Sequence, residues 1–355
     1  MFFLQATTTL LIFHIFLNVF SKITCLYHLF FVSLHKILLS QQGPTLRTII
    51  QSINFHIDNT RKMKNIAFIV NPIAGTKTKN RVSKLIRELL DKEQFSPSVV
   101  VTEYAGHATQ LARQFALEGY YAVIAVGGDG TVNEVASGLR DTETALGIIP
   151  NGSGNGFARH IEISTRMNRA IEMLNTSEPI QVDYCTVNDI PFFSTFGVGS
   201  DAVVAQEFGS NGRGLKGYVE SVFKDFFQYK PENYHLTGKG IDISTKAFLI
   251  NFANAGQWGY DAYIAPKASI QDGWIDIAIA SEFPLIQAPT FALQLFTKNI
   301  DENLYMNTVR AKEVTLTREN EDSPVHIDGT PTKMPKELNI KIVEGGLKVF
   351  VKKRF

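Results

Sequence analysis

Residues 122–139 have the sequence AVIAVGGDGTVNEVASGL, in which an apolar run passes through three glycines into a stretch with helical spacing. The apolar run, Ala122–Val126, has no polar alternation, which is typical of a strand buried on both faces. Thr131–Leu139 predicts a helix directly behind the glycines. A strand that leads through glycines into a helix exposes backbone N–H groups suited to phosphate. This stretch therefore predicts an α/β fold with a phosphate-binding turn.

The same alternation of strand and helix extends to both sides of this stretch. Further apolar strands are predicted at Ile66–Val70, Val99–Val101 and Leu146–Ile149, and helices over residues 79–92, 107–117 and 166–175. Apolar strands separated by helices imply a parallel sheet covered on both faces. Because ligands bind beyond the carboxyl ends of such strands, we expect the four loops that follow the strands to face one crevice.

From about residue 182 the pattern changes to short strands separated by turn residues. Strands are predicted at 182–187, 191–196, 234–237, 247–252, 274–280, 309–317, 324–327, 338–343 and 347–351. Asn188-Asp189 and Gly345-Gly346 indicate turns between them. Helices are fewer, with candidates near 216–228 and 285–298. We therefore expect an α/β domain over residues 63–181 and a mainly antiparallel β domain over residues 182–355.

Composition excludes several classes of protein. The 355 residues are 45% hydrophobic and 19% charged, which is enough to bury a core and is unlike a disordered chain. The net charge of +1 offers no basic field for nucleic acid. The two cysteines, Cys25 and Cys185, form no metal-binding spacing and no disulfide framework, which fits a reducing compartment.

Residues 1–62 differ from the rest of the chain, with two apolar stretches up to Leu39 and a polar linker after them. Three interpretations are open: a membrane anchor, a signal peptide, or translated sequence upstream of a start at Met63. The length of the segment approaches that of a spanning helix. A signal peptide is disfavoured because a basic start and a small-residue cleavage site are missing. We favour the upstream-start interpretation, since Met63 directly precedes the first predicted strand.

Four loops at the predicted crevice carry unusual residues. Gly127-Gly128-Asp129-Gly130 is the strongest, because a carboxylate beside a phosphate is repelled unless a cation or a proton transfer makes use of it. The second is residues 150–159, PNGSGNGFAR, and the weaker two are residues 71–76, NPIAGT, and Thr102 with Gly106-His107. The Gly127–Gly130 loop matches neither GxGxxG nor GxxxxGK[ST], so it is neither of the two common nucleotide loops.

Taken in order, these four loops resemble the diacylglycerol kinase catalytic-domain family, which includes bacterial lipid kinases, sphingosine kinases and ceramide kinases. The GGDGT element alone is also similar to NAD kinases and phosphofructokinases, and the resemblance spans about residues 64–355. It implies a doubly wound nucleotide-binding domain followed by a β-sandwich domain, with ATP and Mg²⁺ as cofactors. The residues that would contact ATP by this resemblance are Asn71, Gly75, Thr76, Thr102, Gly127, Gly128, Asp129, Gly130, Thr131, Asn133, Glu134, Gly152 and Ser153.

The resemblance also implies a structural metal loop within residues 268–276, ASIQDGWID. In that loop Asp272 would bind Mg²⁺ together with the backbone carbonyls of Ser269 and Trp274. The residues themselves leave a second interpretation open, because Asp-Gly is a common hairpin turn pair.

Catalytic roles are implied at two acids. Asp328 would accept the proton of the substrate hydroxyl, and Asp129 would organise the metal–phosphate geometry, with a catalytic Mg²⁺ carried in with ATP. The family has Asp-Gly-Glu where this chain has Asp328-Gly329-Thr330, and the loss of the glutamate leaves catalytic competence to be tested. Asp201 is a candidate substrate contact, with a helix N-cap as the alternative.

Three hypotheses of function follow. The first is an ATP-dependent lipid kinase of phospholipid metabolism, cytoplasmic and peripherally associated with the membrane surface, with a homodimer expected by resemblance and no nucleic-acid partner. Its acceptor could be diacylglycerol, a sphingoid base, ceramide or phosphatidylglycerol, which all present a hydroxyl beside hydrocarbon chains. The second is a kinase of a soluble acceptor such as NAD. The third is a silent ATP- or lipid-binding protein, motivated by Thr330.

Overall fold

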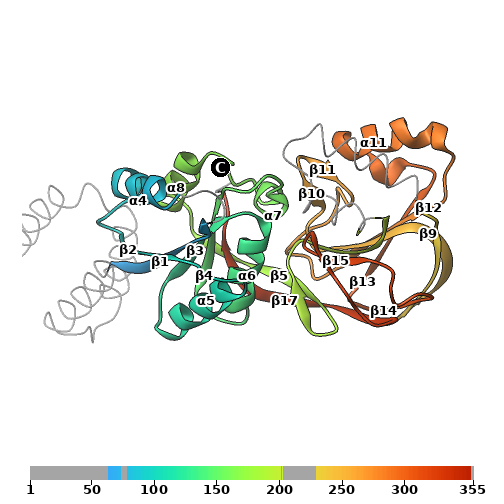
Figure 1. Ribbon diagram of the computed structural model, residues 1–355, viewed down its shortest axis with the longest axis horizontal. Coiled ribbons are helices and arrows are strands. Elements are labelled where there is room, and N and C mark those ends of the chain that lie inside the picture. The colour runs from blue at the N-terminus through green and yellow to red at the C-terminus, as the bar shows by residue number, and fades with distance from the viewer. Residues whose placement is uncertain (1–62, 73–77, 201, 203–228, 353–355) are drawn as a thin grey trace, which may run out of the picture. The chain divides into compact units, whose positions relative to one another are not determined.

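The computed structural model in Figure 1 describes residues 63–72, 78–200, 202 and 229–352. The chain divides into two units, residues 1–62 and residues 63–355, and only the second contains described residues. Among those residues, no helix is long and apolar enough to cross a membrane. The three interpretations of residues 1–62, and the helix predicted near 216–228, therefore concern residues outside the described ranges.

Four parallel strands form the first part of the sheet, in the order β2-β1-β3-β4. Their bounds are Lys64–Val70 for β1, Phe95–Val101 for β2, Ala122–Gly127 for β3 and Ala145–Pro150 for β4. Every residue of β3 and β4 is buried, as expected for central strands of a parallel sheet. The parallel sheet predicted from the sequence is confirmed.

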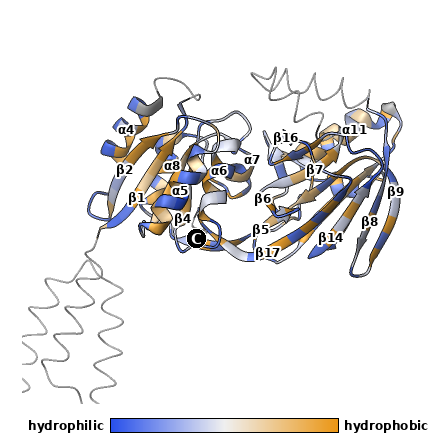
Figure 2. Cartoon of the chain, turned by 60° about the horizontal axis from the view of Figure 1, so that its bottom comes forward, coloured by the Kyte–Doolittle hydropathy of each residue, from blue (hydrophilic) through white to orange (hydrophobic). Residues whose placement is uncertain are grey.

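Helices cover both faces of these strands. They are α4 at Thr78–Leu89, α5 at His107–Leu117, α6 at Asp129–Leu139, α7 at Gly156–His160 and α8 at Met167–Leu174. Helix α4 packs with α8 on one side of the strands, and α5 packs with α6 on the other (Figure 1). Hydrophobic residues gather along the strands, whereas α4 and α5 carry many hydrophilic residues (Figure 2). The short helix α7 was not predicted from the sequence.

The remaining strands pair mainly antiparallel and form the β-sandwich expected from the sequence. They are β5 at Pro179–Val187, β6 at Ile190–Phe192, β7 at Thr195–Gly199, β8 at Glu232–Gly238, β9 at Ile241–Ala253, β10 at Gln257–Gly259, β11 at Ala262–Tyr263, β12 at Ile275–Ser281, β13 at Met306–Ala311, β14 at Glu313–Arg318, β15 at Val325–Ile327, β16 at Thr330–Thr332 and β17 at Glu337–Phe350. One α-helix, α11 at Ala288–Thr297, and two 3₁₀ turns, η2 at Leu285–Gln287 and η3 at Ile300–Glu302, lie between β12 and β13.

Strand β17 links the two parts of the fold. Its first residues pair with β14, its later residues pair with β5, and Val349 pairs with Leu146 of β4. The turn predicted at Gly345-Gly346 is therefore wrong, because the chain continues through it as one strand. The glycines form a bulge instead, with a register shift between Val343 and Leu347 and a positive φ of 62° at Gly345. The turn predicted at Asn188-Asp189 is confirmed as a two-residue hairpin loop with positive φ at both residues.

Asp183 on β5 fastens this bulge to a neighbouring loop. Its carboxylate accepts the Gly345 N–H at 2.8 Å on Oδ1 and the Gly273 N–H at 2.8 Å on Oδ2. Asp183 is only 5% exposed, its bond to Gly273 is buried, and its bond to Gly345 is partly buried. A buried donor without an acceptor carries the full cost of its lost hydration. Asp183 thus holds the crossing strand β17 in register.

We expect Asp183→Ala to lower the free energy of unfolding by about 2–5 kcal/mol, because one buried and one partly buried N–H group lose their acceptor at once. Asp272→Asn, in the same loop, should cost at most about 1 kcal/mol, since its partner Arg310 is a surface cation. Urea unfolding of both variants measures the difference. Equal destabilisation of the two would contradict this role of Asp183.

Candidate active site

The loops that follow the four parallel strands are joined by backbone hydrogen bonds. The Thr102 N–H donates to the carbonyl of Val70 at 3.0 Å, and the Asn71 N–H donates to the carbonyl of Val126 at 3.1 Å. On the other side, the Asn151 N–H donates to the carbonyl of Gly127 at 2.8 Å. Each strand end is thus tied to its neighbour, and the four loops meet at one edge of the sheet as the sequence predicted.

The two glycine-rich loops touch through their backbones. A Cβ atom added to Gly152 would lie 2.5 Å from Cα of Gly128, and one added to Gly128 would lie 3.2 Å from Cα of Gly152. Gly130 is different, because an added Cβ would meet nothing within 4 Å. It stands in the first turn of α6, where backbone N–H groups lack a partner inside the helix. The glycines therefore both allow the loops to meet and leave room for a phosphate group at the start of α6.

Asp129 is the first residue of α6 and points toward the start of α7. Its Oδ2 accepts the Asn155 N–H at 2.8 Å, and Asn155 in turn bonds the backbone of Gly152 through its side chain. Burial raises the pKa of Asp129 to about 6, and the nearby Asp328 adds to the rise, although backbone N–H groups act against it. A carboxyl group with a pKa near the working pH is suited to accept and release a proton.

Asp328 lies in a two-residue hairpin turn between β15 and β16, with φ of 47° there and 77° at Gly329. Its Oδ1 accepts the N–H groups of Ser194 and Thr195, at 2.8 and 3.0 Å. Its Oδ2 accepts the Phe193 N–H at 2.9 Å and the side-chain amide of Asn133 at 2.8 Å. Burial raises the pKa of Asp328, while these four donors favour the charged form. The carboxylate thus ties α6 to the β6–β7 connection.

A pocket of about 340 Å³ lies between these groups. Seven of the residues predicted from the sequence line it, namely Gly128, Asp129, Gly130, Asn133, Gly152, Ser153 and Asp328. Thr330, the residue at the family's glutamate position, also lines it. The structure therefore brings the two glycine loops and the Asp-Gly element of the β domain to one cavity.

Other predicted ATP contacts lie outside this pocket. Asn71 and Thr131 meet through a hydrogen bond of 3.1 Å between their side chains, near the buried Thr102. Glu134 instead accepts the Ala108 N–H at 3.1 Å, which places its carboxylate at the start of α5. Gly127 is buried in β3 beneath Thr131. The remaining predictions, Gly75, Thr76 and Asp201, lie outside the described residues.

The far wall of the pocket is the hairpin β10–β11, which was not predicted from the sequence. Gln257, Trp258 and Tyr260 of this hairpin line the cavity. The amide of Gln257 is fully buried, and neither its nitrogen nor its oxygen has a hydrogen-bond partner. A buried amide without partners is costly and rare in native proteins, which makes this side chain a candidate contact for a bound molecule. In the sequence, the position of Gln257 between a glycine and a tryptophan was the only feature that could have indicated this part of the site.

Close backbone packing holds this hairpin on the second glycine loop. A Cβ atom added to Gly156 would lie 2.9 Å from the carbonyl oxygen of Gln257. Arg159 donates to the Gly154 carbonyl at 3.1 Å and to the Asp261 carboxylate at 2.9 Å. Arg159 therefore fastens the hairpin to the loop.

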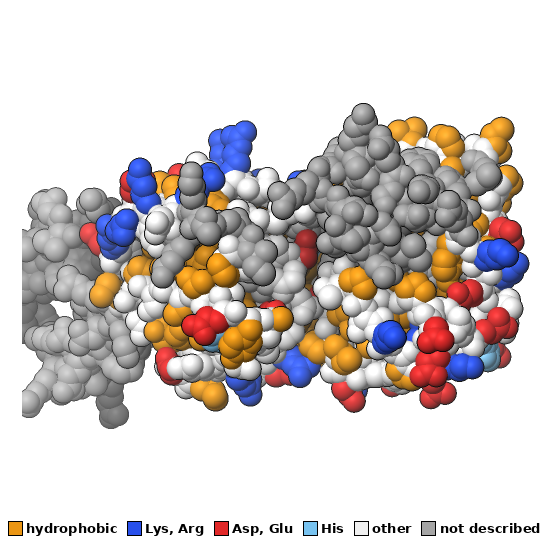
Figure 3. Space-filling view, viewed as in Figure 1, with side chains coloured by type: hydrophobic (Ala, Val, Ile, Leu, Met, Phe, Trp, Pro, Cys, Tyr) orange, Lys and Arg blue, Asp and Glu red, His pale blue; other side chains and the backbone are white. Residues whose placement is uncertain are grey.

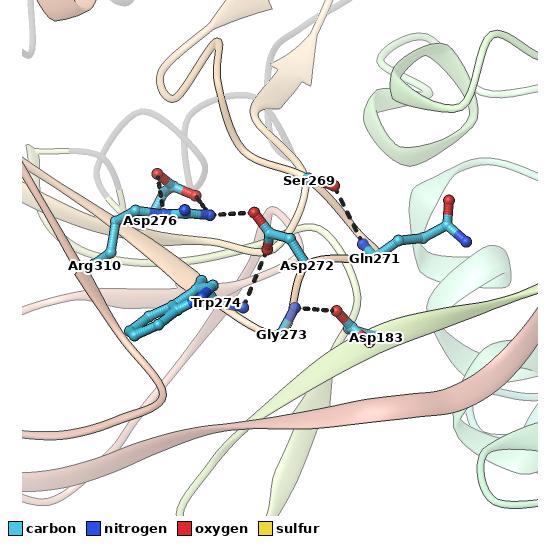
Figure 4. A network of polar contacts seen from close by, with 8 residues as sticks. All are labelled: Asp183, Ser269, Gln271, Asp272, Gly273, Trp274, Asp276 and Arg310. Carbon is cyan, nitrogen blue, oxygen red and sulfur yellow. Dashed lines mark hydrogen bonds and ion pairs between the residues drawn. The ribbon is translucent and has the colours of Figure 1, made fainter.

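The predicted metal loop adopts a turn held by protein groups (Figure 4). The carboxylate of Asp272 accepts the Trp274 N–H at 3.1 Å and forms an ion pair with Arg310, which also contacts Asp276 at 3.3 Å. Ser269 accepts the Gln271 N–H through its hydroxyl at 3.3 Å. Arg310 pairs with the carboxylate of Asp272 in this arrangement, and the predicted Mg²⁺ site of Asp272 with the backbone carbonyls of Ser269 and Trp274 stays a prediction. No group of three or more His, Cys, Asp or Glu in the described part of the chain could hold a metal ion.

Comparison with known proteins identifies the two domains. Residues 65–187 match the model of the diacylglycerol kinase catalytic domain, and residues 194–351 match the YegS C-terminal NAD kinase beta sandwich-like domain. The chain belongs to the diacylglycerol kinase catalytic-domain family. It is a kinase, and its pocket lies where both matched regions contribute residues.

Several known proteins are similar to this chain. The kinase is 31% identical over 305 residues to an uncharacterised protein of Synechocystis, covering 79% of this chain and 70% of that protein. It is 25% identical over 274 residues to a probable lipid kinase YegS-like protein of Yersinia enterocolitica, covering 75% and 90%. The fold is similar to a putative diacylglycerol kinase from Bacillus anthracis, with a TM-score of 0.68, 22% identity, and coverage of 82% of this chain and 98% of that one.

The two kinds of glycine should respond differently to alanine. Gly130→Ala should leave stability unchanged or raise it by up to about 1 kcal/mol, because its Cβ meets no atom and alanine favours a helix. The same methyl group occupies space at the start of α6, so ATP should bind roughly tenfold more weakly, equivalent to about 1.4 kcal/mol. Thermal unfolding and calorimetric ATP titration measure both effects.

Gly152→Ala is the matched comparison. Its methyl group would collide with the backbone of Gly128, so we expect destabilisation of about 1–3 kcal/mol. Normal ATP binding by Gly130→Ala would contradict a phosphate site at the start of α6.

Proposed function

We propose that this kinase transfers the γ-phosphate of ATP to a hydroxyl group of a lipid at a membrane surface, with diacylglycerol and sphingoid bases as the leading acceptor classes. The observation that carries the proposal is the pocket between the first turn of α6 and the hairpin β10–β11. One side offers glycines and the N–H groups of the first helical turn, which have no partner inside the helix and suit phosphate. The other offers a buried, unpartnered amide, which suits a hydroxyl group.

The transfer needs a group that accepts the hydroxyl proton. In the reaction the acceptor oxygen forms a bond to the γ-phosphorus, the bond from that phosphorus to the ADP oxygen breaks, and the hydroxyl proton passes to a carboxylate. The predicted acceptor, Asp328, has both oxygens engaged by four donors. Asp129 also accepts backbone N–H groups, including that of Asn155 at 2.8 Å, but it lines the same pocket and its pKa is raised to about 6. We therefore propose that Asp129 accepts the hydroxyl proton and that Asp328 holds α6 in position.

Magnesium has a supporting place in this scheme. The pocket acids are Asp129 and Asp328, and the described residues contain no cluster that could bind a cation alone. Mg²⁺ would therefore enter with ATP, where it neutralises phosphate charge. The protein's own contribution is the backbone of the glycine loops and the orientation of the acceptor.

The test of this function is transfer of ³²P from γ-labelled ATP to lipids in mixed micelles with Mg²⁺. The panel is diacylglycerol, a sphingoid base, ceramide and phosphatidylglycerol, with NAD as a soluble acceptor. We expect label in one lipid and its loss in Asp129→Asn. Label in NAD alone would favour the soluble-acceptor hypothesis. If the protein is folded and binds ATP but labels no acceptor, the result would favour the hypothesis of a silent binding protein.

The two acids should be separated by the pH dependence of kcat/KM. For the unmodified kinase we expect activity to fall below about pH 6, because Asp129 takes up a proton there and can no longer accept one. Asp328→Asn should lower kcat roughly 10–100-fold through displacement of α6. The Asp328→Asn variant should still lose kcat/KM at low pH, but the fall should occur at lower pH. The reason is that removal of the neighbouring negative charge lowers the pKa of Asp129. Disappearance of the limb in Asp328→Asn would instead make Asp328 the proton acceptor.

Gln257→Leu tests the acceptor side. We expect the variant to gain about 1 kcal/mol of stability, because a buried amide without partners is replaced by an apolar side chain of similar size. We expect KM for the lipid to rise roughly tenfold, since a hydrogen bond to the acceptor is lost. Gln271→Leu is the control, because Gln271 is exposed and lies in the metal-loop turn. An unchanged KM for Gln257→Leu would remove this residue from the acceptor site.

A further inference from the structure

Helix α11 is apolar on two opposite sides. Ala288, Phe291 and Leu295 are buried in a core with Phe248 and Phe283. The other side exposes Ile286 at 85%, Leu293 at 63% and Phe296 at 40%, together with Pro289. These four positions follow the i, i+3, i+7, i+10 spacing of one helical face when η2 and α11 are taken together. We call them the outer stripe.

An exposed helix of a water-soluble domain normally carries polar residues on its outer side. Single exposed apolar residues need no explanation, but a continuous row of large ones marks an interaction surface. Hydrophobic side chains gather at the surface over α11 in the upper right of Figure 3. The charge of this region points to the kind of partner, because no acidic residue lies between Glu282 and Asp301 and the only charge there is Lys298.

The outer stripe is also connected to the catalytic pocket. Helix α11 packs against β11, and Lys298 lies over the ring of Tyr263 at 4.3 Å from its centroid. The hairpin β10–β11 carries Gln257, Trp258 and Tyr260 into the pocket. One packed element therefore separates the outer stripe from the acceptor wall.

We propose that the outer stripe of α11 docks on a lipid bilayer, with the apolar side chains in the interfacial layer and Lys298 beside anionic headgroups. The choice of a bilayer rests on the proposed lipid acceptor. Because a lipid stays in the membrane, the pocket can reach it only if the protein docks on the membrane surface. A helix of ten residues is too short to span, so the contact is interfacial. Docking at α11 would bring the acceptor side of the pocket close to the membrane surface.

The test places a tryptophan on the outer stripe of the full chain. Phe296→Trp is mixed with vesicles of equal parts phosphatidylcholine and phosphatidylglycerol, with and without bromine on the acyl chains. Bromine quenches only indoles within the bilayer, so we expect roughly a twofold greater fractional loss of emission than in the unmodified chain, whose own tryptophans are Trp258 and Trp274. The control is Leu117→Trp, since Leu117 is 78% exposed at the end of α5 and should show no added quenching.

Quenching of Phe296→Trp equal to that of the unmodified chain would overturn the proposal. Leu293→Trp, at a more exposed position, repeats the test if the first variant folds poorly. If instead Leu293→Gln with Phe296→Gln converts a dimer to a monomer in light scattering, and neither tryptophan is quenched, the stripe joins two copies of the chain. Quenching needs no catalysis, so its outcome is independent of whether a lipid is phosphorylated.

Discussion

The arrangement of the site depends on the hydrogen bonds of one carboxylate. Asp328 accepts three consecutive N–H groups of residues 193–195 and the side-chain amide of Asn133 on α6, so one residue of the β domain fixes the helix at which we propose the phosphate site. Charge-assisted hydrogen bonds of this kind are stronger than neutral ones, and in a buried setting each also removes the cost of an unsatisfied donor. The crossing strand β17, held in register by Asp183, carries the same β domain back to β4. The hydrogen bonds of Asp328 and the strand β17 together determine where the α/β domain and the β domain meet.

The pocket combines features that are costly to the fold. Asp129 is buried with a raised pKa, so at neutral pH its ionised form opposes folding, and this cost is absent below the ordinary pKa of an aspartate. Gln257 buries an amide without partners. Unfavourable features persist at functional sites because the surroundings enforce them. Here the two lie on opposite walls of one cavity, one beside the glycine loops and the other on the hairpin β10–β11. In the proposed function, that placement separates the phosphate side of the pocket from the acceptor side.

The α/β domain could be predicted closely from the sequence, because its strands are uninterrupted apolar runs and its loops carry glycines. The family resemblance also located Asp129, Gly128 and Asp328. The β domain was less predictable. Residues 309–317 form two strands separated by Lys312, and Gly345-Gly346 is a bulge, because pairing partners far along the chain decide where a strand bends. Glu134 lies at the start of α5, which no local pattern indicates. The hairpin with Gln257 was missed because its role comes from packing against residues 154–156.

A crystal structure with a non-hydrolysable ATP analogue and Mg²⁺ tests the central claim most directly. We expect the γ-phosphate to lie against the N–H groups of Gly130 and Thr131, between the two glycine loops, with Asp129 facing the hairpin β10–β11. In that structure Asp328 should keep its bonds to residues 193–195 and to Asn133. A γ-phosphate bound elsewhere, or Asp328 turned out of its hydrogen bonds toward the phosphate, would contradict the proposed phosphate site and the choice of Asp129 as proton acceptor.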